Sequence, residues 1–156
     1  MSGEKLFHYT KSGLDDVWLA NGYRVEMTEY GEGVAIDRAH ELHQVIARAI
    51  VDSARPVLGQ HARFLRIMLD LSQTDLGKLL GVDRATVIRW EKAREKPLAL
   101  MADIAIRETY AARAGGSLIA GVIRQLQEAD EKQHGREYRS VFETKNSGWR
   151  ESSLAA

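Results

Sequence analysis

The stretch Gln73-Thr-Asp-Leu-Gly-Lys-Leu-Leu-Gly-Val-Asp-Arg-Ala-Thr-Val-Ile-Arg-Trp-Glu-Lys92 decides the fold of this chain. Apolar residues recur in it at intervals of three and four, which is the spacing of one buried face of an α-helix. A glycine interrupts the pattern, so the stretch predicts two short helices joined by a tight turn. The inward positions are Leu76, Leu79 and Leu80 in the first helix, and Val87 and Trp90 in the second.

The residues around the turn have the chemistry that two closely crossing helices require. Ser72 and Asp83 precede the two helices, and their oxygens suit N-caps because they accept hydrogen bonds from unpaired helix N–H groups. Gly81 suits the left-handed residue that ends a helix. Gly77 lacks a side chain where a larger one would hold the helices apart. The pattern therefore predicts a helix-turn-helix.

The wider stretch, residues 65–97, resembles the Xre/Cro-type helix-turn-helix of phage repressors and many bacterial antitoxins. The resemblance is specific because apolar, small, glycine and capping positions fall in register together. It implies a lambda-repressor-like helix-turn-helix domain that binds DNA. The matching residues are Leu71-Ser72-Gln73, Leu76-Gly77, Leu80-Gly81-Val82, Thr86-Val87, Arg89-Trp90-Glu91-Lys92 and Lys96-Pro97.

The resemblance implies that the second helix enters the major groove and that residues near its start face base edges. Arginine can donate two hydrogen bonds to guanine, and Ala85 or Ile88 can touch a thymine methyl group. Gln73 and Thr86, at the starts of the two helices, are expected at the DNA backbone. The implied DNA-binding residues are Gln73, Arg84, Ala85, Thr86, Ile88, Arg89, Lys92, Arg94 and Lys96.

The resemblance also implies a structural ion pair between Arg66 on the preceding helix and Glu91 on the reading helix. Such a bridge would tie the two helices together. Ala93 stands where a glycine is common in the family. A left-handed helix end is therefore not expected at this position.

Composition bounds the function further. The 156 residues contain no cysteine, which excludes disulfides and cysteine-ligated zinc and fits a cytoplasmic protein. The sequence shows no membrane-spanning run, metal-ligand cluster, phosphate loop or nucleophile–base spacing, so we expect no membrane association, no cofactor and no enzymatic activity. Net charge is zero, but residues 1–60 carry −3 and residues 61–113 carry +3. This positive excess is small, so tight DNA binding is expected to require two subunits.

Residues 6–36 predict a small β-sheet. Asn21-Gly22 between apolar runs is typical of a hairpin turn, and Tyr23, Val25 and Met27 alternate with polar residues as in a half-buried strand. A third strand is expected at residues 34–36. We interpret the aromatic residues as the core of this sheet, and a partner-binding surface is the alternative. These residues are Phe7, Tyr9, Trp18 and Tyr23.

Helical patterns follow on both sides of the central motif. Residues 37–53 predict an amphipathic helix capped by Asp37, with His40 and His43 exposed to solvent. Pro56 and Gly59 mark a linker to a lead helix at residues 61–70. A closing helix is expected at residues 98–113, with Pro97 at its first turn. The inward residues are Leu42, Val45, Ile46, Ala49 and Ile50 in the first helix, Phe64, Leu65, Met68 and Leu69 in the second, and Leu98, Met101, Ile104, Ala105 and Tyr110 in the third.

The C-terminal part predicts a further amphipathic helix and a hairpin. Leu118, Ile119, Val122, Ile123 and Leu126 share one helical face. Residues 138–144 alternate as in a strand, and a return strand begins at Trp149 after turn residues. The hairpin is expected to extend the N-terminal sheet. The predicted fold is mainly α with a small β unit (α+β), divided into residues 1–58, 59–114 and 115–156.

The leading hypothesis is a sequence-specific transcriptional regulator, a repressor that binds double-stranded DNA as a homodimer on an inverted repeat. The alternative is an antitoxin that binds a toxin and also represses its own operon. A β-rich N-terminal unit followed by this helix-turn-helix is similar in layout to MqsA-type antitoxins. Those antitoxins hold zinc with cysteines, which this chain lacks, so zinc is not expected here.

Overall fold

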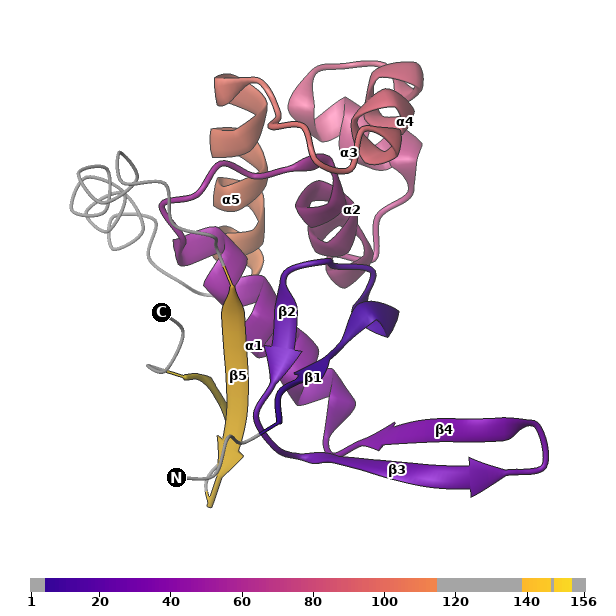
Figure 1. Ribbon diagram of the computed structural model, residues 1–156. Helices are drawn as coiled ribbons and strands as arrows, with labels where there is room; N and C mark the ends of the chain where they lie inside the picture. The colour runs from indigo at the N-terminus through magenta and orange to yellow at the C-terminus, as the bar shows by residue number, and fades with distance from the viewer. Residues whose placement is uncertain (1–4, 115–138, 147, 153–156) are drawn as a thin grey trace. The chain divides into compact units, whose positions relative to one another are not determined.

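The computed structural model describes residues 5–114, 139–146 and 148–152, and it has a mixed α+β fold (Figure 1). The chain separates into two compact units. One holds the residues up to Ile46 together with the C-terminal strands, and the other begins at Ala47. The boundary lies inside helix α1 (Ala39–Asp52). The amphipathic stretch at 118–126 lies outside the described residues.

The first unit is built on a four-stranded sheet with the order β1-β2-β5-β6. Its strands are β1 (Phe7–His8), β2 (Val17–Leu19), β5 (Ser140–Lys145) and β6 (Gly148–Glu151). A short 3-10 helix, η1 (Thr10–Ser12), joins the first two. Strand β2 pairs antiparallel with β1 and parallel with β5, so the C-terminal hairpin continues the N-terminal sheet. Leu14, Val17, Leu19, Val141 and Phe142 form its buried core.

Strands β3 (Tyr23–Thr28) and β4 (Gly31–Ile36) form a separate two-stranded hairpin that extends as an arm (Figure 1). The prediction of a hairpin turn at Asn21-Gly22 is wrong, because β2 pairs with β1 and β5 instead of β3. The pairing of β2 with β5, a strand distant in the sequence, outweighs the local preference of Asn21-Gly22 for a hairpin turn. Gly22 has a positive φ of 79° and lies against the Trp149 ring, so it redirects the chain and does not close a hairpin.

The burial predicted for strand β3 is also wrong. Val25 is 55% exposed and Met27 is 80% exposed, although both alternate with polar residues as expected. The alternation has the expected period, but within the described residues no layer covers the part of the apolar face formed by Val25 and Met27. Among the four aromatic residues predicted as a sheet core, only Tyr9 is buried, and Phe7 stacks on Tyr23 at 4.8 Å between ring centroids.

Helix α1 begins at Ala39, so Asp37 is not its N-cap. Asp37 instead offers its carbonyl oxygen to Nε1 of Trp149 at 2.8 Å, and Arg38 adopts a positive φ of 48° before the helix. His40 is exposed as predicted, but His43 is half-buried and its Nε2 lies 2.9 Å from the Tyr9 hydroxyl. The exposed position predicted for His43 is therefore wrong, because Tyr9 packs over it.

The described residues of the second unit contain the end of α1 and four further helices. These are α2 (Gly59–Met68), α3 (Gln73–Leu80), α4 (Arg84–Lys92) and α5 (Leu100–Ala114). Gly59 begins α2 and is not part of a linker. Pro97 lies three residues before α5, in a β-bridge with Leu58, and not in the first turn of the helix. The buried apolar centre consists of Val57, Leu65, Leu76, Val87 and Ile106.

Three residues predicted to face inward lie on the surface. Leu79 is 51% exposed, Met101 is 75% exposed and Ile104 is 42% exposed. The face of α5 is rotated relative to the prediction because two charged residues, Asp103 and Arg107, occupy its buried side. The spacing of apolar residues predicts that Asp103 and Arg107 face solvent, but both are buried.

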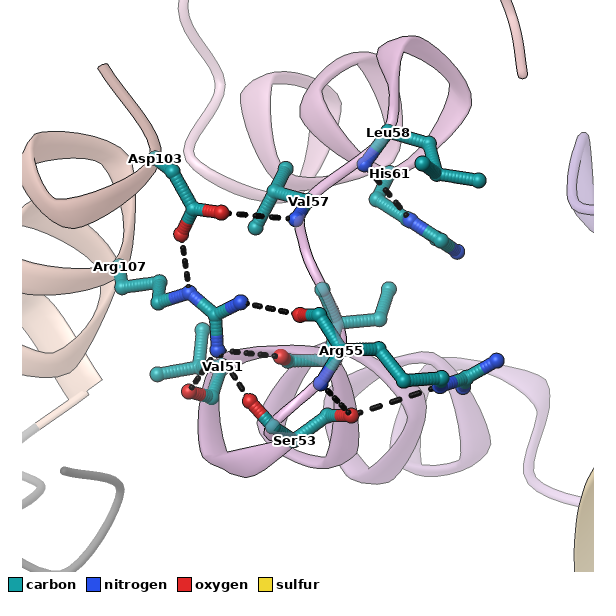
Figure 2. A network of polar contacts seen from close by, with 9 residues as sticks. Val51, Ser53, Arg55, Val57, Leu58, His61, Asp103 and Arg107 are labelled. Carbon is teal, nitrogen blue, oxygen red and sulfur yellow. Dashed lines mark hydrogen bonds and ion pairs between the residues drawn. The ribbon is translucent and has the colours of Figure 1, made fainter. Parts of the chain in front are cut away.

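Arg107 and Asp103 of α5 form hydrogen bonds with the main chain of the segment that connects α1 to α2 (Figure 2). The Arg107 guanidinium donates hydrogen bonds to carbonyl oxygens of Val51, Ser53 and Arg55 at and beyond the end of α1. It also pairs with one Asp103 oxygen, while the other Asp103 oxygen accepts from the Val57 N–H at 2.8 Å. The pair therefore satisfies the main chain of a buried turn from α5.

Candidate nucleic-acid interface

The two helices of the central motif have the caps that the sequence predicts. Ser72 Oγ accepts from the Asp75 N–H at 3.0 Å, and Asp83 Oδ1 accepts from the Thr86 N–H at 2.8 Å. Gly81 ends α3 with a left-handed φ of 73°. These local hydrogen bonds fix where each helix begins and ends, so the start of α4 is held at a defined position.

The turn between α3 and α4 approaches Gly77 closely. A Cβ atom on Gly77 would lie 2.7 Å from the Val82 carbonyl oxygen, which is too close for a real side chain. The turn can therefore pack directly on α3. Leu76 and Val87 are fully buried on the inner sides of the two helices. This packing leaves the opposite side of α4 free to carry polar residues.

The outward side of α4 is cationic. Arg84, Ala85, Arg89 and Lys92 are exposed, and Ile88 is half-buried beside them. Residues three and four apart are neighbours on a helix surface, and spacings of three and four link these five residues along one side of α4. Glu91 is the only acidic residue on α4, and it is buried. The exposed charge of this helix is therefore entirely positive.

Glu91 is held inward by Arg66 of α2. The Arg66 Nε lies 2.9 Å from Glu91 Oε2, and Nη2 lies 2.8 Å from Oε1. The remaining Arg66 nitrogen, Nη1, donates to the Leu71 carbonyl oxygen at 3.0 Å. Only 15% of the Arg66 side chain and 6% of the Glu91 side chain are exposed. This two-pronged pair anchors α4 to α2 and also removes the one negative charge from the outer face of α4.

Thr86 is engaged in the cap of α4. Its hydroxyl donates to Asp83 Oδ1 at 2.6 Å. Hydrogen bonds from the Thr86 side chain and then from its backbone N–H hold the pKa of Asp83 below its ordinary value. Because the hydroxyl proton is used by the cap, Thr86 helps to fix the start of α4.

The segment after α4 runs alongside the start of α2. The Lys96 carbonyl accepts from the Gly59 N–H at 3.0 Å, and the Arg94 carbonyl accepts from the Gln60 N–H at 3.1 Å. The Lys96 side chain is exposed, and the Arg94 side chain is half-buried, as is Gln73 at the start of α3. Arg94 and Lys96 thus contribute main-chain anchoring at this point, in addition to their side-chain charge.

Gly59 is a structural residue that the sequence did not reveal. A Cβ atom on it would overlap the carbonyl oxygens of Trp90 and Ala93, so the first residue of α2 touches the end of α4. Ala93 ends α4 with φ −85° and ψ 66°, which is not left-handed and agrees with the expectation from its side chain. The approach of two distant segments, rather than a local turn, requires glycine at position 59.

Residues 63–105 match the family model described as Helix-turn-helix. With the capped α3–turn–α4 unit, this match identifies the segment as an Xre-type, lambda-repressor-like helix-turn-helix, a family of DNA-binding transcriptional regulators. No curated protein and no solved structure matches the chain. Among the described residues, no helix has the length and apolar character needed to cross a membrane, and no three potential metal ligands gather.

Proposed function

We propose that the protein is a sequence-specific DNA-binding repressor that acts as a homodimer on an inverted repeat. The observation that carries the proposal is the outer side of α4, where Arg84, Arg89 and Lys92 are exposed while Glu91 is withdrawn against Arg66. Such a side suits the major groove, which is lined by phosphates and presents acceptors on guanine. Because duplex DNA is the proposed ligand, the expected location is the cytoplasm.

The side chains on α4 divide into two roles. Arg84 and Arg89 have the geometry to donate two hydrogen bonds to guanine O6 and N7, while Ala85 and Ile88 suit a thymine methyl group. Lys92 lies at the end of the helix, and a single ammonium there suits a phosphate. Gln73, Arg94 and Lys96 extend the phosphate contacts on both sides, and Thr86 supports the position of α4.

Two copies are required because one short helix reads only a few base pairs. A two-fold dimer presents two copies of α4 to successive turns of the major groove, and the operator then has matching symmetry. The half-sites are expected about 10 base pairs apart, centre to centre. Bound in this way across a promoter, the protein would exclude polymerase, which is the basis for the proposed repression.

The test is selection of binding sites from random duplex DNA, followed by affinity measurements with two variants. Arg89→Ala is expected to cost about 1–3 kcal/mol on the selected site and to relax preference at one base pair. Lys92→Ala is expected to weaken selected and random duplexes alike and to lower the salt dependence by about one counterion. Selection that enriches no sequence above random duplex would exclude the proposed function.

A further inference from the structure

The outer part of the β3–β4 hairpin, beyond Tyr23, has apolar residues that the described part of the chain leaves uncovered. On strand β3, Met27 is 80% exposed and Val25 is 55% exposed, and Tyr30 in the turn that follows is 98% exposed. Among the residues that the structure describes, the hairpin forms a sheet of two strands, and such a ribbon is marginally stable in water without further packing. An open strand edge beside exposed apolar residues is a template for pairing with another strand.

The hydrogen-bond pattern shows which residues offer that edge. The Gly22 carbonyl accepts from the Asp37 N–H at 2.9 Å, next to the Tyr23–Ile36 pair of the β3–β4 ladder. In an antiparallel ladder, alternate residues point their N–H and C=O groups toward the partner strand. Even-numbered residues of β3 therefore face β4, while Tyr23, Val25 and Met27 direct their main-chain groups outward.

We propose that β3 pairs antiparallel with β3 of a second copy of this chain, about a two-fold axis at Val25. In this register Val25 is opposite Val25 of the partner subunit, and Tyr23 is opposite Met27 of the partner subunit. These residues are the ones whose main-chain groups point outward, so they form the hydrogen-bonded pairs. The apolar side chains of both copies then continue one face across four strands, β4-β3-β3-β4.

Charge selects both the occupant and the register. Arg24 lies opposite Glu26 of the partner subunit, and the reciprocal pair forms across the axis. Both belong to the closely spaced, non-hydrogen-bonded positions, where opposite charges attract most strongly. A shift of the register by two residues keeps the same main-chain groups facing the partner strand. In one direction this shift places Arg24 opposite the partner's Arg24, and in the other it places Glu26 opposite the partner's Glu26. Strand β3 is therefore self-complementary in one register, which favours a second copy over an unrelated strand.

This inference deepens the proposed function, which requires two copies, but its test uses no DNA. The association of the full chain is measured by sedimentation equilibrium for Arg24→Glu and Glu26→Arg. Each substitution places like charges opposite each other twice, and each is expected to raise the dimer dissociation constant about tenfold or more. An equimolar mixture restores opposite charges across the interface and is expected to recover wild-type affinity as a heterodimer.

The mixture distinguishes the interface from effects inside one chain. Arg24 and Glu26 are 3.8 Å apart within the hairpin, but each variant keeps its own like-charge pair in the mixture. Recovery on mixing can therefore come only from contact between chains. Glu29→Arg makes the same change of charge in the turn outside β3, and it is expected to leave association unchanged.

A second variant tests the main-chain pairing. Val25→Pro removes an N–H that points away from β4, so the hairpin keeps its own ladder while the central hydrogen bonds of the proposed interface are lost. Circular dichroism verifies folding of each variant. The dimer is expected to weaken strongly with Val25→Pro and to persist with Arg89→Ala, which lies in the proposed DNA-binding face.

Three results overturn the proposal. They are a wild-type chain that stays monomeric, a dimer that Arg24→Glu and Val25→Pro leave intact, and a mixture that fails to recover. Failure of DNA selection, with these association results as expected, would instead exclude the DNA-binding function and leave the β3 pairing standing. A monomeric chain that captures a different protein through this hairpin would assign the surface to that protein.

Discussion

The guanidinium of Arg66 on α2 and the carboxylate of Glu91 on α4 are joined by two hydrogen bonds of 2.9 and 2.8 Å. The pair has a second consequence besides anchoring. It withdraws the only acidic side chain of α4 from a helix whose other charged residues are exposed and positive. One interaction therefore fixes both the position and the charge of the proposed DNA-reading helix.

Arg66→Ala is expected to lower the free energy of unfolding by about 3 kcal/mol, because it leaves Glu91 buried without its main cation. Chemical denaturation measures this loss. Arg63 offers a matched control, since it lies 3.8 Å from the same Glu91 oxygen but its side chain is 49% exposed. Arg63→Ala is expected to cost less than about 1 kcal/mol. Equal losses in the two variants, or an unchanged melting temperature for Arg66→Ala, would contradict this role.

The contact between Gly59 and the end of α4 gives a second prediction. Gly59→Ala is expected to destabilise the protein by about 2 kcal/mol, because the new methyl group meets main-chain oxygens that cannot rotate away. Thermal unfolding measures the effect. Gly33→Ala is the control, since its methyl group would meet atoms only at ordinary contact distances of 3.5 and 3.8 Å. We expect that variant to change stability by less than about 1 kcal/mol. A tolerated alanine at position 59 would show that the α2–α4 approach can relax.

The features that sequence predicted well are set by neighbouring residues. Ser72, Gly81 and Asp83 act within a few residues of their own position, so capping chemistry was sufficient to locate α3 and α4. The Arg66–Glu91 pair spans 25 positions and has no local signature. Only the family resemblance, which supplies both partners, predicts it.

The features that sequence mispredicted are set by distant partners. Asn21-Gly22 has ideal hairpin chemistry, but β5 takes the place beside β2 and leaves β3 to pair elsewhere. Likewise, the apolar spacing assigns Met101 to the core, although Arg107 occupies the buried side of α5. Arg107 is buried because main-chain carbonyl oxygens at and beyond the end of α1 accept its hydrogen bonds. The spacing of apolar residues in the sequence carries no information about these carbonyl groups.

Arg107→Met is expected to destabilise the protein by about 3 kcal/mol. The substitution leaves Asp103 buried without its cation and leaves several carbonyl oxygens without their hydrogen-bond donor. Adding Asp103→Leu is expected to recover little. A simple buried ion pair can often be replaced by apolar residues, but here the carbonyls of Val51, Ser53 and Arg55 would still lack their donor.

Arg113→Ala is the control for that series, because Arg113 lies on the same helix, is exposed and makes one hydrogen bond, to the Leu69 carbonyl oxygen at 3.2 Å. It is expected to cost less than about 1 kcal/mol. Urea unfolding of the four proteins compares the losses. Recovery of wild-type stability in the Arg107→Met, Asp103→Leu double variant would show that the ion pair, and not the capping of α1, dominates the stability of the segment that connects α1 to α2.

The Tyr9–His43 contact predicts how stability depends on pH. Burial and then the nearby His40 charge lower the pKa of His43 below its usual 6.5, so the folded chain favours the neutral imidazole. The unfolded chain then binds a proton at a higher pH than the folded chain does. The stabilising contribution of His43 is therefore complete above about pH 6.5 and declines as pH falls from there through the lower folded pKa.

Two measurements check this dependence. An NMR titration should give a His43 midpoint below that of an unfolded control, and His40→Asn should raise that midpoint by removing the neighbouring positive charge. His43→Gln should flatten the dependence of unfolding free energy on pH between neutrality and mild acid. The direction of the shift in the His43 pKa is decisive. A Tyr9 oxygen that accepts a hydrogen bond from the His43 Nε2–H would favour the imidazolium and raise the pKa instead. A His43 midpoint above 6.5 would therefore show that the hydroxyl, 2.9 Å away, outweighs the loss of solvent.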